Sequence, residues 1–112
     1  MKETPEHRWD KELGESYIGK YILVGITYLD HEGNEKQRQQ MHGIVVSASE
    51  EQGITIQLKG VYEGISWTMP PEQRAIHEAS PGIYTLDETD EEIDNPDLLS
   101  TWTVQDPESR PE

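Results

Sequence analysis

Outside one plain acidic run, the densest set of potential metal ligands lies between residues 25 and 43, in the stretch GITYLDHEGNEKQRQQMHG. An EF-hand calcium loop needs a glycine at its sixth position and a glutamate at its twelfth. If Asp30 is the first position of the loop, Gly33 is the fourth, and no glutamate stands at the twelfth. A helical zinc motif needs two histidines four residues apart, whereas His31 and His42 are eleven apart. We therefore expect no metal site among the potential ligands, which are Asp30, His31, Glu32, Glu35 and His42.

The same stretch has the features of a β-hairpin tip. Gly33 and Asn34 are residue types that adopt the left-handed backbone conformations of tight turns, and the runs on either side are predicted strands. A solvated hairpin tip therefore explains the polar residues without a ligand. His42 lies inside the second strand, and we expect it to be a structural histidine bonded to a backbone group.

The chain lacks the motifs of the common enzyme classes. It has no cysteine, which excludes disulfides, thiol catalysis and cysteine-based zinc sites. The serines lie mostly in predicted turns without a nucleophile-elbow motif, and no phosphate-binding loop or cofactor fingerprint is present. We expect a protein that is not an enzyme, with no catalytic residue and no cofactor. Because acidic residues abound, a small hydrolase that uses paired carboxylates remains the alternative.

The charge balance restricts the partners. The chain carries 23 acidic and 9 basic residues, for a net charge of -14. This charge disfavours nucleic acids and anionic membranes, so the natural counterpart is a basic protein or a cation. Six of the eight residues 87–94 are acidic. Such a run is typical of a solvated, mobile loop, and it would speed association with a basic partner.

The order of predicted elements begins with a short helix. Residues 4–14 have an N-cap candidate at Thr4, a proline at the first helical position, and Gly14 as the stop signal. From Ile18 onward the pattern changes to strands. Pro70 and Pro71 end strand pairing, residues 71–82 include one helical or 3₁₀ turn, and a further turn of helix is expected at Asn95-Pro96. The predicted strands span residues 21–29, 39–49, 54–59, 65–69, 83–86 and 101–104.

These elements predict one β-rich domain at residues 18–105, between an N-terminal tail with a short helix (1–17) and a C-terminal tail (106–112). Short strands joined by tight turns favour a mostly β fold, either a small antiparallel barrel or a strongly bent sheet, with an SH3-like barrel as first choice and an OB-like barrel second. Gly25 and Gly43 lie in mid-strand, where glycine often marks a bulge or corner. No apolar run suits a signal peptide or a membrane span, so we expect a cytoplasmic protein.

Several runs together carry a resemblance. They are GKYILVGITYLDHEG, QMHGIV, GITIQL, MPP, PGIYTL and NPDLLSTWTV, and they cover roughly residues 18–105. In this arrangement the chain resembles a family of small, acidic, uncharacterised bacterial proteins. The resemblance implies a bacterial source and no particular activity.

The functional expectation is a non-catalytic protein-binding module, either an adaptor or an inhibitor of the immunity-protein type, with a basic protein as its partner. Aromatic residues and arginine are common in interaction hot spots, and three such candidates lie near the Pro70-Pro71 turn. A purely structural subunit is a further alternative, and the sequence does not indicate the oligomeric state. The expected anchors are Tyr62, Arg74 and His77, and the residues expected to attract the partner are Asp90, Glu91 and Glu92.

Overall fold

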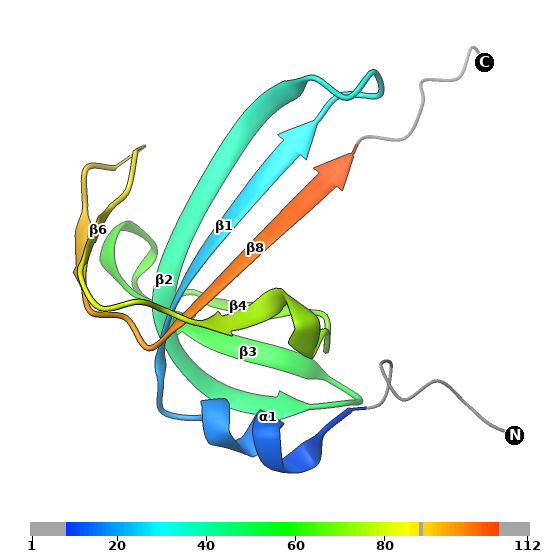
Figure 1. The fold of residues 1–112 in the computed structure, drawn as a ribbon, viewed down its shortest axis with the longest axis vertical. Coiled ribbons are helices and arrows are strands. Elements are labelled where there is room, and N and C mark those ends of the chain that lie inside the picture. Colours follow the sequence, from blue (N-terminus) through cyan, green and yellow to red (C-terminus); the bar gives the residue numbers. More distant parts are fainter. Residues whose placement is uncertain (1–8, 88, 106–112) are drawn as a thin grey trace, which may run out of the picture.

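The computed structural model describes residues 9–87 and 89–105, and it is mostly β (Figure 1). The described residues form one α-helix, α1 (Lys11–Tyr17), and two 3₁₀ turns, η2 (Gly60–Tyr62) and η3 (Gln73–Ala75). The strands are β1 (Tyr21–Leu29), β2 (Glu35–Ser49), β3 (Gly53–Leu58), β4 (Ser66–Met69), β5 (Ile76–Glu78), β6 (Ile83–Thr85), β7 (Glu92–Asp94) and β8 (Leu98–Gln105). The prediction of a mostly β chain with a short N-terminal helix is therefore confirmed.

The helix lies further along the chain than predicted. Asp10 is the N-cap, and its carboxylate accepts a hydrogen bond from the Leu13 N–H at 3.1 Å. Gly14, predicted to stop the helix, lies inside it. The Trp9 ring packs where a Cβ at this position would stand, so a glycine fits there. The helix ends where Ile18 becomes extended. The predicted cap, Thr4, lies outside the described residues.

Six strands form one open sheet in the order β4-β3-β2-β1-β8-β5. Because β4 and β5 are its two edges and do not pair with each other, the sheet is not closed, and the predicted barrel is wrong; neither the SH3-like nor the OB-like choice is confirmed. The sheet is also not purely antiparallel, since β1 and β8 pair in parallel, with Ile22 opposite Leu98 and Leu29 opposite Gln105. A parallel pair requires a long crossover connection. Here β2 to β7 provide it.

The long strand β2 produces the bend in the sheet. Its first part pairs with β1, and its last part pairs with β3, with a register shift between Val45 and Ser47. Gly43 lies where the two pairings meet, and a Cβ there would overlap the Gln57 carbonyl. Figure 1 shows β2 curving from the hairpin with β1 down to β3. The predicted corner at Gly43 therefore coincides with this change of partner, whereas Gly25 lies in regular pairing.

The two faces of the sheet carry separate cores. We call the face that bears Ile22, Val24 and Ile26 the inner face, where the main core gathers residues from β1, β2, β3, β4, β5 and β8. The opposite, outer face bears Leu23, against which Leu86 and Ile93 are buried. These two residues come from the segment that contains β6 and β7, so the hairpin covers the outer face of the sheet. Residues 87–94, expected to form a solvated loop, therefore include a strand and a core residue.

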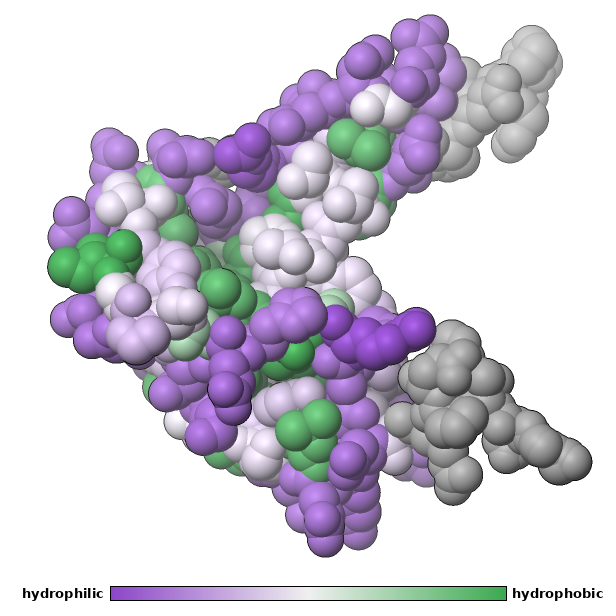
Figure 2. Space-filling view, in the orientation of Figure 1, coloured by the Kyte–Doolittle hydropathy of each residue, from purple (hydrophilic) through white to green (hydrophobic). Residues whose placement is uncertain are grey.

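One part of the sheet extends beyond the rest. We call this part the arm; it consists of residues 24–29 of β1, 35–42 of β2 and 100–105 of β8. Figure 2 shows a hollow between the arm and the lower part of the molecule.

The helical turn predicted at Asn95-Pro96 is wrong, because the chain enters β8 at Leu98. The strand predicted from Ile65 begins at Ser66 instead, and Ile65 is exposed.

Candidate functional site

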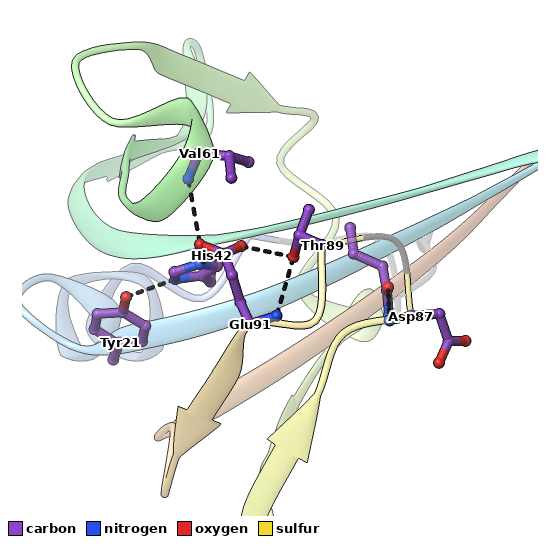
Figure 3. Close-up of polar contacts among 7 residues, drawn as sticks. Tyr21, His42, Val61, Asp87, Thr89 and Glu91 are labelled. Atoms are coloured by element: carbon purple, nitrogen blue, oxygen red, sulfur yellow. Dashed lines mark hydrogen bonds and ion pairs between the residues drawn. The ribbon is translucent and has the colours of Figure 1, made fainter.

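A partly buried polar network lies where the β6–β7 segment meets the sheet (Figure 3). The Tyr21 hydroxyl lies 2.7 Å from His42 Nδ1, and Glu91 Oε1 lies 3.2 Å from His42 Nε2. His42 is only 6% exposed and, with Ser100, makes up the buried polar residues of the described chain. Thr89 donates its hydroxyl to Glu91 Oε1 at 2.9 Å. We call Tyr21, His42, Thr89 and Glu91 the His42 network.

The network joins elements that are distant in sequence. The Val61 N–H of η2 donates to Glu91 Oε2 at 3.2 Å. The Lys59 N–H donates to the His42 carbonyl at 2.8 Å. Gly60 makes this approach possible, because its φ of +67 suits glycine and a Cβ there would overlap the Glu91 carboxylate. Glu91 therefore links the β6–β7 segment both to the sheet and to η2.

Local pairing brings these side chains together. Tyr21 and His42 both point to the outer face, since Tyr21 is opposite Ile44 and His42 is opposite Leu23. Their ring centroids are 5.8 Å apart. Glu91 follows a turn that is closed by a hydrogen bond from the Asp90 N–H to the Leu86 carbonyl at 2.9 Å, and this turn positions its side chain.

The Tyr21 phenol keeps its proton at neutral pH. Burial raises the pKa of the Tyr21 phenol, and the nearby carboxylates of Glu91 and Glu63 raise the pKa further. The phenol therefore stays protonated at neutral pH and has a proton to donate. A carboxylate oxygen accepts hydrogen bonds, so the His42 tautomer with its proton on Nε2 satisfies both contacts, with Nδ1 accepting from Tyr21 and Nε2 donating to Glu91.

A histidine between a hydroxyl and a carboxylate is also the geometry of an activated nucleophile. Two observations oppose that chemistry here. A raised phenol pKa disfavours the phenolate that a tyrosine nucleophile or base would need. Two pockets lined by described residues also lie elsewhere, one of about 550 Å³ beside Lys20, Glu78 and Asp97, and one of about 400 Å³ beside Trp9, Glu15 and Glu51. The geometry favours a structural role for the His42 network.

The sequence prediction for His42 was right about the strand and wrong about the bonding partners. His42 lies within β2 and is buried, but its ring bonds to the side chains of Tyr21 and Glu91, and not to a backbone group. Sequence reasoning missed Tyr21 and Thr89 entirely. The available signal was the pair of apolar residues Leu86 and Ile93, which enclose the acidic run and indicate that part of it is buried.

The stretch considered as a metal site is a hairpin tip. Asp30 Oδ1 accepts hydrogen bonds from the backbone N–H groups of Asn34 at 2.9 Å and Glu32 at 3.0 Å. The Asn34 N–H is the main cause that lowers the pKa of the Asp30 carboxyl. Glu35 pairs with Arg38, and His42 belongs to the buried network described above. Within residues 9–87 and 89–105, no group of three or more histidine, cysteine and acidic side chains is placed to hold a metal ion.

The structure distributes the three expected anchors over different elements. Tyr62 belongs to η2 and packs against the main core, next to the Val61 N–H that binds Glu91. Arg74 belongs to η3, which contacts β8, and its Nε donates to Glu72 at 2.6 Å. His77 lies exposed on β5 opposite Leu99. Of the three, only Tyr62 adjoins a residue that bonds to the acidic run, since the N–H of its neighbour Val61 donates to Glu91.

The three acidic candidates differ in their environments. Asp90 is exposed and has a φ of +63. Glu92 is exposed in β7. The side chain of Glu91 is only 22% exposed and is committed to the His42 network. Of these three candidates, Glu91 therefore has a structural contact, whereas Asp90 and Glu92 are exposed to solvent.

Comparison of the chain with protein-family models, with curated protein sequences and with solved structures finds no match. The resemblance to small acidic bacterial proteins therefore stays a prediction. Among the described helices, none has the length and apolar character needed to span a membrane.

Proposed function

We propose that this chain is a non-catalytic protein-binding module whose partner is a basic protein. The observation that carries the proposal is the way the fold presents its acidic run. The buried residues Leu86 and Ile93 and the Glu91 carboxylate fix the segment on the outer face of the sheet. Asp90, Glu92 and Asp94 are thereby held exposed, in a chain whose net charge is -14.

A fixed acidic surface suits recognition of a basic protein for two reasons. Charges that are already positioned lose less conformational entropy on binding than charges on a mobile loop. The net charge attracts a basic partner over a distance of about 8 Å at physiological salt, which mainly speeds association. Both an adaptor and an inhibitor that covers a basic active site would use such a surface.

The buried network supports a binding module over a carboxylate hydrolase. Among the described acids of the run, Glu91 is the most buried; it bonds to His42 and Val61 and does not line either described pocket. Tyr62 is the best-placed anchor, because it lies in η2 beside this carboxylate. Replacing Tyr62 by Ala is therefore expected to raise the dissociation rate more than replacing Arg74 by Ala does. For a true anchor, the dissociation rate is expected to rise about tenfold.

Association kinetics with a basic protein captured from the source cells tests the proposal. The double variant Asp90→Asn/Glu92→Gln removes two charges, and asparagine tolerates the left-handed conformation at position 90. We expect slower association and a weaker salt dependence, with an unchanged dissociation rate. The matched control is Glu50→Gln/Glu51→Gln, which removes two exposed charges between β2 and β3. An equal effect of the control, or turnover in a broad hydrolase screen, would contradict the proposal.

A further inference from the structure

The outer edge of β8 is the one long stretch of the arm that has neither a paired strand nor charged side chains. Within the described residues, β5 pairs only with residues 98–100 of β8, so 101–105 pair with β1 alone. These five residues read TWTVQ. The opposite edge of the arm, on β2, carries Glu35, Lys36 and Arg38, which is how proteins usually protect an edge strand.

The direction of the backbone groups at this edge follows from the β5 pairing. The Ala79 N–H donates to the carbonyl of Asp97, just before β8 begins, at 3.0 Å. Because backbone groups point to alternate sides along a strand, Leu99, Thr101, Thr103 and Gln105 direct their N–H and C=O groups to the same side. Leu99 is covered by β5. Thr103 and Gln105 face outward beyond it.

The side chains next to this edge are suited to contact an added strand. Trp102 lies opposite Ile26, and Val104 lies opposite Tyr28, so all four residues are on the inner face. Trp102 is half-buried, and Val104 is 44% exposed. An extended segment placed beside β8 would direct alternate side chains into this partly apolar surface, next to the hollow in Figure 2.

We infer that the free edge of β8 accepts an extended segment of the basic partner by strand addition. The candidate occupants of this edge are a basic segment and a second copy of the chain, and charge decides between them. Gln105 Nε2 donates to the carbonyls of Asp30 and His31, at 3.4 Å and 3.3 Å, so the end of the edge lies beside a turn that carries Asp30 and Glu32. A second copy of the chain would bring a further net charge of -14, whereas a basic segment would be attracted. This inference rests on the proposed function and names the surface that function would use.

The probe is the peptide Lys-Val-Lys-Val-Lys-Val-Lys, which has alternating apolar residues and a strand-forming backbone. Its matched control is Lys-Pro-Lys-Pro-Lys-Pro-Lys, which has the same charge but cannot form a strand ladder. With the full chain at low salt, we expect the valine peptide to bind more tightly than the proline peptide. We also expect the amide protons of Thr103 and Gln105 to become protected from hydrogen exchange on binding.

Two variants of the full chain test the edge itself. Thr103→Pro removes an N–H that faces outward, so the pairing with β1 is retained, and it is expected to weaken the valine peptide about tenfold. Thr103→Val keeps the N–H and is expected to bind as the unchanged protein does. A circular dichroism spectrum like that of the unchanged protein would show that Thr103→Pro is folded. If the variant is not folded, the amide protection in the unchanged protein decides whether strand addition occurs.

The remaining outcomes separate the two proposals. Equal binding of both peptides, with no effect of Thr103→Pro, overturns strand addition and leaves an acidic module that binds basic proteins. No binding of either peptide at low salt overturns both. If sedimentation shows a dimer that Thr103→Pro converts to a monomer, the occupant is a second copy, and the inference of a basic segment is wrong.

Discussion

Removing the Glu91 carboxylate tests whether the His42 network holds the molecule together. In the variant Glu91→Ala, His42 Nε2 and the Val61 N–H both lose the acceptor that they have in the folded protein. His42 is 6% exposed, so water does not readily replace that acceptor. The Thr89 hydroxyl also loses the acceptor to which it donates, but Thr89 is only half-buried, so water can replace that acceptor.

The expected magnitude follows mainly from His42. A buried donor left without a partner costs about 1–3 kcal/mol, and η2 contributes less because Val61 is exposed. We therefore expect Glu91→Ala to lower the free energy of unfolding by about 2 kcal/mol, which corresponds to a fall of about 1 M in the urea midpoint. Urea titration followed by tryptophan fluorescence measures this change, since Trp67 and Trp102 both pack against the main core.

The neighbouring variant Glu92→Ala is the control. It removes the same charge from an exposed position in β7, and its effect is expected to stay within about 0.5 kcal/mol. If the two variants have equal midpoints, the carboxylate of Glu91 contributes only its charge, and the structural role argued for the network is refuted.

Two pH-dependent effects are expected. The folded pKa of Tyr21 is raised above its ordinary value of 10.0. The contribution of the Tyr21 phenol to stability is therefore present below about pH 10 and is lost as the pH rises through the folded pKa. The urea midpoint of Tyr21→Phe should accordingly fall less in alkali than that of the unchanged protein. The folded pKa of Asp30 is lowered below 3.8, so the contribution of its carboxylate to stability is present above that pH and is lost in stronger acid. The Asn34 amide proton signal should therefore shift with a midpoint below pH 3.8. A midpoint at or above that value would contradict the Asp30–Asn34 bond.

The positions of most strands followed from local pattern, but β5 and β7 were not predicted, and neither was the sheet topology. The alternation of Ile54, Ile56 and Leu58 with polar residues predicted β3 correctly, because one face of that strand is buried. Closure is different, since it depends on whether β4 and β5 meet, and no local pattern encodes the separation of two edges. The parallel pairing of β8 with β1 is likewise decided by the path of the intervening chain.

The candidate site was only partly accessible from sequence for a related reason. The acidic run was recognised, but the charge pattern of residues 87–94 predicts exposure for every acid equally. Glu91 is half-buried because Leu86 and Ile93 on either side occupy the outer core, which brings the carboxylate to His42. A partner 49 residues away in the chain leaves no spacing signal, whereas the Asp30 hairpin tip, whose bonds are local, was predicted correctly.

Gly25 and Gly43 allow the bend in β2 to be tested with one matched pair of substitutions. Both glycines lie in mid-strand, but a Cβ at Gly25 would meet nothing within 4 Å, whereas a Cβ at Gly43 would overlap the Gln57 carbonyl and stand 2.9 Å from the Leu58 Cα. Backbone atoms of a paired strand cannot move aside without breaking the ladder, so Gly43→Ala is expected to destabilise the fold by about 1–3 kcal/mol. Gly25→Ala reduces the freedom of the unfolded chain without a clash and is expected to stabilise it by about 0.4–1 kcal/mol. Urea midpoints that move in opposite directions would support the close crossing of β2 and β3 at Gly43; equal midpoints would mean that the two strands do not approach each other there as closely as described.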